Sequence, residues 1–249
     1  MDLGIAGRTA LVAASSAGLG YATAKALADA GCKVAISGRN EERLHQAAEN
    51  IPDAIPIIAD VSSVEGSTQL IERANEALDS SIDILVTNAG GPPPGTFAST
   101  DLSQYLSALE LNLMSVVAMC KEAVPEMQNK QWGRVLAITS ISVRQPIPNI
   151  MLSNTARAGA TGFLKTLALE VAADGVTVNS IQPGFHATDR VKDLYGDKNL
   201  EDLANGVPAK KIGSAEDFGK IAAFLCSEQA GYITGAALPV AGGTYGGLQ

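Results

Sequence analysis

The stretch TALVAASSAGLG, residues 9–20, decides the fold of this 249-residue chain. TALVA at 9–13 is an apolar run of the length of a buried strand, and small residues with two glycines follow it directly. We expect a helix to begin at Gly18. Because a glycine-rich turn between a strand and a helix lets backbone N–H groups approach an anion closely, the stretch predicts a pyrophosphate-binding turn. A turn of small residues can also serve tight packing alone, so the rest of the sequence must decide between the two.

Six further short apolar runs alternate with longer helical patterns. Near-continuous apolar runs are typical of strands that helices cover on both faces, and the segments between them are long enough to cross over a sheet. The sequence therefore predicts an α/β fold of the Rossmann type, with a doubly wound, seven-stranded, mostly parallel sheet and helices on both faces. The expected strands are 9–13, 33–37, 54–58, 82–87, 134–139, 176–181 and 236–240.

Two long helices are expected at 101–130 and 153–173. The first opens with DLSQ, the pattern of a capping box, and both carry apolar faces broader than contact with a single sheet requires. Such a face favours either packing against a second subunit, in a homodimer or homotetramer, or burial in the protein's own core. The sequence leaves both open. No linker or repeat interrupts the chain, so we expect a single domain over 1–249.

The composition indicates a folded protein with a small-molecule ligand. Hydrophobic residues make up 46% and charged residues 18%, and the formal net charge is −8 without a cluster of Lys or Arg. Nucleic acid and anionic membranes bind concentrated basic surfaces, so neither is an expected partner. No apolar run is long enough to span a bilayer, and no signal peptide is recognisable. We expect a cytoplasmic protein, with Cys32, Cys120 and Cys226 as buried thiols and with no metal site.

The residue after the second strand bears on the choice of cofactor. In dinucleotide-binding sheets an acid at this point holds the adenosine ribose, whereas an arginine accepts a 2′-phosphate. SGRN at 37–40 places Arg39 there. The arginine favours NADP(H) over NAD(H).

Several motifs in a fixed order make the chain similar to the short-chain dehydrogenases/reductases over essentially its whole length. Residues 13–20 resemble the family's Thr-Gly-x-x-x-Gly-x-Gly turn, although Ala13 and Ala14 stand where the family has Thr-Gly. VNSIQPGFHAT at 178–188 resembles the family's segment under the nicotinamide, and YITGAALPVAGG at 232–243 its C-terminal strand. The resemblance implies these cofactor-binding residues: Ala14, Ser15, Ser16, Gly18, Leu19, Gly20, Arg39, Asp60, Val61, Asn88, Ala89, Gly90, Pro183, Gly184 and Thr188.

The resemblance also implies catalytic residues, and two of them depart from the family. Ser140 matches the family's serine and Asn112 its asparagine. Alignment on GFLKTLALE at 162–170 places Ser153 and Arg157 at the two positions of the family's Tyr-x-x-x-Lys. No tyrosine occurs between positions 105 and 195, so a small shift of the alignment does not supply one.

The exchange of Tyr and Lys changes the chemistry available. Hydride transfer to a carbonyl builds negative charge on its oxygen, and a phenol with a pKa of about 10 can neutralise that charge. A serine hydroxyl is a much weaker acid, and arginine does not relay protons as lysine does. In one interpretation Ser140 and Ser153 donate hydrogen bonds to the oxyanion, Arg157 holds the nicotinamide ribose and Asn112 binds a water. In the other, Ser153 is an N-cap and Arg157 a helix-surface ion pair.

The substrate pocket is expected from three segments. Ser142 and Arg144 follow the serine, His186 follows the turn under the nicotinamide, and Tyr195 lies in a lid over about 189–213 that the resemblance implies. His186 titrates in the range useful for proton transfer, but a loop histidine bonded to a carbonyl has the same sequence signature. Arg144 either attracts an acidic substrate or lies unpaired on the surface.

Three hypotheses about function follow. The first is an atypical NADP(H)-dependent oxidoreductase that acts on a carbonyl or alcohol and resembles the β-ketoacyl carrier-protein reductases. The second is a catalytically silent relative that binds NADP(H) as a sensor or partner subunit. The third is a transferase that binds a nucleotide or methyl donor. Arg39 disfavours this hypothesis because such sites usually have an acidic residue at the end of the second strand. The matches at Pro183, Gly184 and Thr188 favour the first.

Overall fold

A seven-stranded sheet forms the centre of the computed structural model, which describes residues 1–191 and 200–248. Its order is β3-β2-β1-β4-β5-β6-β7, and every neighbouring pair of strands is parallel. The predicted architecture is confirmed, and each expected strand matches within two residues at either end. The strands are β1 (Thr9–Val12), β2 (Lys33–Gly38), β3 (Ile55–Ile58), β4 (Ile84–Thr87), β5 (Gly133–Ile138), β6 (Val176–Pro183) and β7 (Ala237–Val240).

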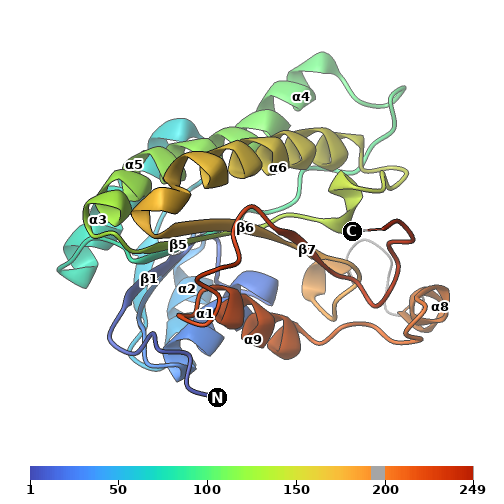
Figure 1. Ribbon diagram of the computed structural model, residues 1–249. Helices are drawn as coiled ribbons and strands as arrows, with labels where there is room; N and C mark the ends of the chain where they lie inside the picture. Colours follow the sequence, from blue (N-terminus) through green and yellow to red (C-terminus); the bar gives the residue numbers. More distant parts are fainter. Residues whose placement is uncertain (192–199, 249) are drawn as a thin grey trace.

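Helices cover both faces of this sheet. They are α1 (Gly18–Asp29), α2 (Glu41–Ala48), α3 (Val64–Leu78), α4 (Leu102–Leu109), α5 (Ser115–Asn129), α6 (Met151–Val171), α8 (Leu200–Gly206) and α9 (Ala215–Leu225). Figure 1 shows α3, α5 and α6 in the layer above the sheet and α1, α2 and α9 in the layer below it. The expected start of α1 at Gly18 is confirmed.

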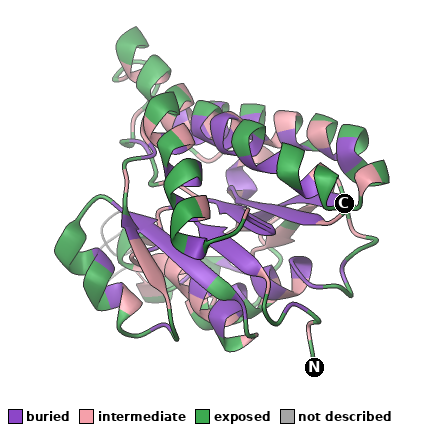
Figure 2. Ribbon diagram, turned by 90° about the vertical axis from the view of Figure 1, so that its left-hand side faces the viewer, coloured by how far each residue is buried: buried purple, intermediate pink, exposed green. Residues whose placement is uncertain are grey.

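Alternation along the strands divides the apolar core between the two layers. In β1, Leu11 packs with the cluster that includes α3, α5 and α6, while Val12 packs with the cluster that includes α1, α2 and α9. Both side chains are fully buried, and the central strands are buried along their length (Figure 2). Strands covered on both faces need apolar residues at consecutive positions, which explains their near-continuous apolar runs.

The order of the strands reverses at the middle of the sheet. Leu11 of β1 lies opposite Ala35 of β2 on one side and Leu85 of β4 on the other. The connections that leave β1 and β4 therefore run to opposite halves of the sheet. In doubly wound sheets this reversal opens a crevice at the carboxyl ends of the strands, and ligands bind there.

The two long helices differ in detail from the prediction. α4 and α5 are joined by a π-helical segment, Glu110–Met114, instead of forming one regular helix. The backbone N–H of Asp101 donates to Gln104 Oε1 at 2.8 Å, in agreement with the predicted capping box. α6 begins at Met151, two residues before its expected start. Ser153 therefore lies in the first turn of α6 and is not its N-cap, because Ile150 occupies that position.

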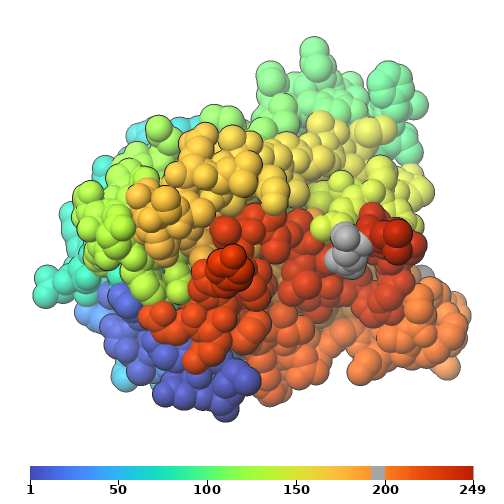
Figure 3. Space-filling model, in the orientation of Figure 1, coloured from blue at the N-terminus to red at the C-terminus, as the bar shows by residue number. Residues whose placement is uncertain are grey.

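The C-terminal segment lies beside the residues that follow α8. The backbone N–H of Ala209 donates to the Gly242 carbonyl at 3.0 Å, and Figures 1 and 3 show the two segments side by side. Among the described residues no helix combines the length and apolar character needed to cross a membrane.

The three cysteines agree with the prediction. Cys32, Cys120 and Cys226 are buried free thiols.

Candidate active site

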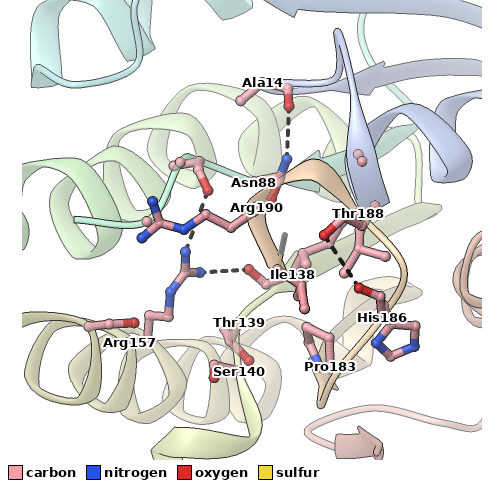
Figure 4. A pocket seen from close by; sticks show the side chains of 18 of the residues that line it. Ala14, Asn88, Ile138, Thr139, Ser140, Arg157, Pro183, His186, Thr188 and Arg190 are labelled. Atoms are coloured by element: carbon pink, nitrogen blue, oxygen red, sulfur yellow. Dashed lines mark hydrogen bonds between the residues drawn. The ribbon is translucent and has the colours of Figure 1, made fainter. Parts of the chain in front are cut away.

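A cavity of about 480 Å³ opens at the carboxyl edge of the sheet, where the strand order reverses. The turn after β1, the ends of β4, β5 and β6, and the first turns of α6 form its wall (Figure 4). It brings together most of the predicted site residues, namely Ala14, Gly18, Leu19, Gly20, Asn88, Ala89, Gly90, Ser140, Ser153, Arg157, Pro183, Gly184, His186 and Thr188.

The turn after β1 has the backbone geometry of a glycine-rich turn although alanine occupies one of its positions. Ala14 has a φ of +46° and Gly18 a φ of +62°, both in the left-handed region. The side-chain amide of Asn88 donates to the carbonyls of Ala13 and Ala14 at 3.2 and 3.0 Å. The end of β4 thus holds the turn in a conformation that a Cβ disfavours.

Glycine is required at position 20 because neighbouring atoms leave no room for a side chain. A Cβ at Gly20 would lie 2.7 Å from Asn88 Nδ2 and 3.0 Å from the carbonyl oxygen of Ala14. The first turn of α1 therefore packs directly against the turn and presents its N–H groups toward the cavity. Such a helix N-terminus fits a pyrophosphate, because its N–H groups and its dipole both favour an anion.

Ser15 and Ser16 occupy the same turn but do not line the cavity. The Ser15 hydroxyl is fully buried, donates to the Val12 carbonyl at 2.6 Å and accepts from the Ser37 N–H at 3.2 Å. Ser16 packs beside Gly38, where a Cβ would meet its side chain at 3.2 Å. The Ser15 N–H donates to the Ser37 carbonyl at 2.7 Å, so Ser15 fixes the turn to β2 and is not exposed to the cavity.

Two serine hydroxyls reach the cavity from different elements. Ser140 follows β5, and its Oγ accepts from the Ser142 N–H at 3.1 Å, so the proton on Oγ remains free to be donated elsewhere. Ser153 lies on α6 and makes no side-chain hydrogen bond within the described part of the chain. Both are half-buried and line the same cavity. Together they offer two hydroxyl donors to one bound group.

Arg157 lies one turn further along α6 with its side chain almost wholly buried, at 9% exposure. Its Nη1 donates to the Ile138 carbonyl at 3.0 Å and its Nη2 to the Ala89 carbonyl at 3.4 Å (Figure 4). Burial, and next the positive charge of Arg190, lower the pKa of the Arg157 guanidinium to about 10. The interpretation of Arg157 as a helix-surface ion pair was wrong, because the side chain points inward across the ends of β4 and β5.

Asn112 stands in the π-helical segment behind the cavity and is 3% exposed. Its Nδ2 donates to the Gly90 carbonyl at 3.0 Å. Its Oδ1 is buried and has no hydrogen-bond partner among the described residues. A buried amide oxygen in this situation fits a bound water.

The predicted adenosine-binding residues lie outside this cavity. Arg39 and Asp60 line a second pocket, in which a guanidinium nitrogen of Arg39 lies 3.9 Å from a carboxylate oxygen of Asp60. The Arg39 side chain is 74% exposed, so most of its donors face solvent. Val61, in contrast, is buried in the core with α3 and α5.

Two predicted pocket residues point elsewhere. Arg144 donates to Gln182 Oε1 at 2.9 Å and to the Ala237 carbonyl at 2.7 Å, and its guanidinium stacks over the Tyr245 ring at 5.4 Å. It is thus neither an unpaired surface residue nor part of the cavity wall. Ser142 is 1% exposed and also lies outside the cavity.

The segment after β6 places its residues in order along one side of the cavity. A Cβ at Gly184 would meet the Cβ of Ala241 at 2.8 Å, so the Pro183-Gly184 turn lies directly against the C-terminal segment. His186 is 4% exposed, its Nδ1 lies 3.2 Å from the Gly184 carbonyl, and its ring packs edge-on against Phe218. Burial lowers the pKa of His186. The ring is therefore packed against α9, while Thr188 lines the cavity beside Gly18.

The cavity also contains charged residues that the sequence analysis missed. Arg43 pairs with Asp189 at 3.2 Å, and Arg190 donates to the Pro92 carbonyl at 3.1 Å. Arg43 lies in the first turn of α2, four residues after Arg39, and this short separation could have suggested a second basic residue near the cofactor. Asp189 and Arg190 follow Thr188 directly, but nothing in the sequence indicates which way their side chains turn.

Tyr195 and part of the expected lid lie outside the described residues.

A doubly wound parallel sheet with a glycine-rich turn at its point of reversal is the architecture of dinucleotide-binding α/β proteins. A family model described as enoyl-(acyl carrier protein) reductase matches residues 13–245. The chain belongs to this family of short-chain dehydrogenases/reductases.

Named relatives resemble the chain over nearly its full length. The 3-oxoacyl-(acyl-carrier-protein) reductase of Haemophilus influenzae is 35% identical over 240 residues, which cover 96% of this chain and 98% of the relative. Dehydrogenase/reductase SDR family member 4 of Homo sapiens is 33% identical, with 96% and 88% covered. The crystal structure of L-sorbose reductase from Gluconobacter frateurii, complexed with NADPH and L-sorbose, matches with a TM-score of 0.93 at 31% identity, and both chains are covered completely. These relatives support a nicotinamide-dependent redox role.

Proposed function

We propose that this protein is an NADP(H)-dependent oxidoreductase of carbonyl or alcohol substrates in which Ser140, Ser153 and Arg157 act in place of a tyrosine and lysine pair. The observation that carries the proposal is the single cavity that joins the glycine-rich turn to these three side chains. A protein that bound only the adenosine half of a dinucleotide would have no use for polar groups at the far end of that cavity.

The residues of the cleft fit the cofactor. The backbone N–H groups of the turn and of the start of α1 would hold the pyrophosphate, and Arg39 and Arg43 would receive the 2′-phosphate. Thr188 and the Pro183-Gly184 turn would border the nicotinamide. When bound, NADPH supplies a hydride to the substrate carbon.

The two serines act on the substrate oxygen. Negative charge develops on that oxygen as the carbonyl is reduced, and donors placed around it stabilise the transition state more than the ground state. Ser140 donates its proton toward the cavity because its oxygen already accepts from Ser142. Ser153 adds a second hydroxyl from α6. Removal of one such donor typically costs about 100- to 1,000-fold in rate.

Arg157 and Asn112 act behind the oxygen. The guanidinium of Arg157 is fixed by two backbone carbonyls, so it brings a positive charge to the cavity without reorganising during the reaction. The unpaired Oδ1 of Asn112 fits a water that delivers a proton to the substrate oxygen and takes up another from solvent, while the two serines stabilise the oxyanion by hydrogen bonds. A missing phenolic acid costs about two to four powers of ten, so slow turnover is expected.

Consumption of NADPH with a panel of ketones, quinones and ketoacyl thioesters tests the proposal. We expect slow turnover by the wild type, a decrease of at least about 100-fold for Ser140→Ala and Arg157→Ala, and faster turnover by the Ser153→Tyr/Arg157→Lys double variant. Ser107→Ala serves as the matched control, because this serine is exposed on α4 and lies outside the cavity.

The alternative is a catalytically silent protein that binds NADP(H) as a sensor or partner subunit. Tight NADPH binding together with no turnover of any substrate would establish that alternative. Equal rates for Ser140→Ala and Ser107→Ala would remove the serine from the reaction.

A further inference from the structure

The cavity carries a positive charge that the rest of the protein does not share. Of the described residues that line it, three are arginines and one is an acid, while the whole chain has a formal net charge of −8. The acid, Asp189, already pairs with Arg43 at 3.2 Å. Arg157 and Arg190 therefore share the remaining part of the cavity without a carboxylate from the described protein.

Arg157 differs from Arg134, the other buried arginine, in having no acidic partner among the described residues. Arg134 is 3% exposed, and Glu228 lies 3.8 Å from its guanidinium, which also stacks over Trp132 at 4.3 Å. Arg157 is buried to a similar degree but has only backbone carbonyls as partners in the described residues. A buried charge without a counter-charge is costly, so its persistence in a cavity indicates that an anion enters.

Arg190 adds a second cation at the same place. Figure 4 shows its guanidinium close to that of Arg157, and the repulsion between them contributes to the lowered pKa of Arg157. One of its nitrogens donates to the Pro92 carbonyl at 3.1 Å. A guanidinium has several N–H donors in a planar fork, so Arg190 retains donors for a ligand. Two like charges brought together without an acid between them form a receptor for an oxyanion.

We infer that the substrate carries a carboxylate attached to its carbonyl or alcohol carbon directly or through at most two further carbons, and that Arg190, supported by Arg157, binds this carboxylate. The inference rests on the proposed function and names its substrate class, an oxo acid or hydroxy acid.

The phosphates of the dinucleotide are a less suitable source of the negative charge. The pyrophosphate fits the turn after β1 and the start of α1, and the 2′-phosphate fits Arg39 and Arg43. Arg157 and Arg190 lie instead with Ser140 and Ser153, where the substrate oxygen is expected. A carboxylate also matches the fork of a guanidinium in shape.

Matched pairs of acids and neutral esters test the inference. We would compare pyruvate, acetoacetate and levulinate with their methyl esters as oxidants of NADPH. For at least one carbon spacing we expect kcat/KM to be about tenfold or more higher for the acid, and Arg190→Gln to reduce that preference to less than about twofold. Lys220→Gln is the control, since it removes the same charge from an exposed ion pair on α9.

A binding experiment separates this inference from the proposed reaction. Propanoate, butanoate and pentanoate would be titrated calorimetrically into the protein with bound NADP⁺, with the corresponding amides as controls, and none of these requires turnover. Carboxylate binding that Arg190→Gln abolishes supports the anion site even if no ketone is consumed. Equal behaviour of acids and neutral analogues in both experiments would overturn it. A large loss of NADPH affinity in Arg190→Gln would also overturn it, because Arg190 would then serve the cofactor.

Discussion

The side-chain amide of Asn88 donates to the Ala14 carbonyl at 3.0 Å and ties the end of β4 to the turn after β1. This bond connects the two strands between which the strand order reverses. Gly20 packs against Asn88 and the Ala14 carbonyl so closely that a Cβ would not fit. Ala14 is thereby held at a φ of +46°, where an alanine loses about 1–2 kcal/mol relative to the right-handed region.

Replacing Ala14 with glycine should relieve that strain. The gain of about 1–2 kcal/mol is partly offset by about 0.4–1 kcal/mol of added entropy in the unfolded chain, so we expect a net stabilisation of about 0.5 kcal/mol in urea unfolding. The neighbouring Ala13→Gly is the matched control: Ala13 has no positive φ and is fully buried, so the glycine should destabilise by about 1 kcal/mol. Losses of equal size in both variants would show that Ala14 is unstrained.

The fold follows from sequence patterns to the extent that each pattern has one physical cause. Strands covered on both faces require consecutive apolar residues, so VAISG of β2 and VLAI of β5 are readable directly. The π-helical segment around Asn112 is not readable, because its widened hydrogen bonding depends on how α4 and α5 pack. The start of α6 at Met151 is not readable either. Its N-cap residue, Ile150, makes no side-chain capping hydrogen bond, so the sequence has no capping signal at this position.

The parts of the candidate site that are formed by backbone can be predicted from the sequence. The parts that are formed by long side chains are harder to predict. The glycine-rich turn and the Pro183-Gly184 turn lie at the cavity because strand ends fix them. Arg144 and Arg190 both lie in the segment that follows a strand. Arg144 nevertheless turns to Gln182 of β6 and the Ala237 carbonyl of β7, whereas Arg190 turns into the cavity. Rotamers of long side chains are chosen by tertiary contacts, and a sequence does not display those contacts.

Arg39 should set the preference between the two nicotinamide cofactors. Its side chain is exposed and only weakly held by Asp60 at 3.9 Å, so it is free to bind a 2′-phosphate. We expect Arg39→Ala to raise the Kd for NADPH about 10- to 100-fold, as loss of a charge-assisted hydrogen bond does, and to leave the Kd for NADH within about twofold. Fluorescence titration of both cofactors measures this. Arg43→Ala tests the second arginine, and a parallel loss of NADH affinity in Arg39→Ala would contradict the assignment.

The three cysteines should be unreactive in the folded protein. Burial raises the pKa of Cys32, Cys120 and Cys226 to about 12, so at pH 8 almost none of each thiol is ionised. The thiolate is the nucleophile, and we expect iodoacetamide to label the native protein at least about 100-fold more slowly than the protein in guanidinium chloride. Mass spectrometry would count the labels. Rapid native labelling of any one site would show that its thiol is accessible.

His186 should make the folded protein sensitive to mild acid. Burial lowers its pKa below the value of about 6.5 that it has in the unfolded chain. As the pH falls below 6.5, the unfolded chain therefore takes up a proton that the folded protein does not, and the free energy of unfolding decreases until the pH reaches the folded pKa. The glutamine of His186→Gln does not titrate. The wild type should therefore lose stability relative to the variant as the pH falls from 7.5 to 5. Urea unfolding at a series of pH values measures this, with His45→Gln on the exterior of α2 as control. Identical pH dependence in all three proteins would mean that the ring, although packed between the Gly184 carbonyl and Phe218, accepts a proton without cost.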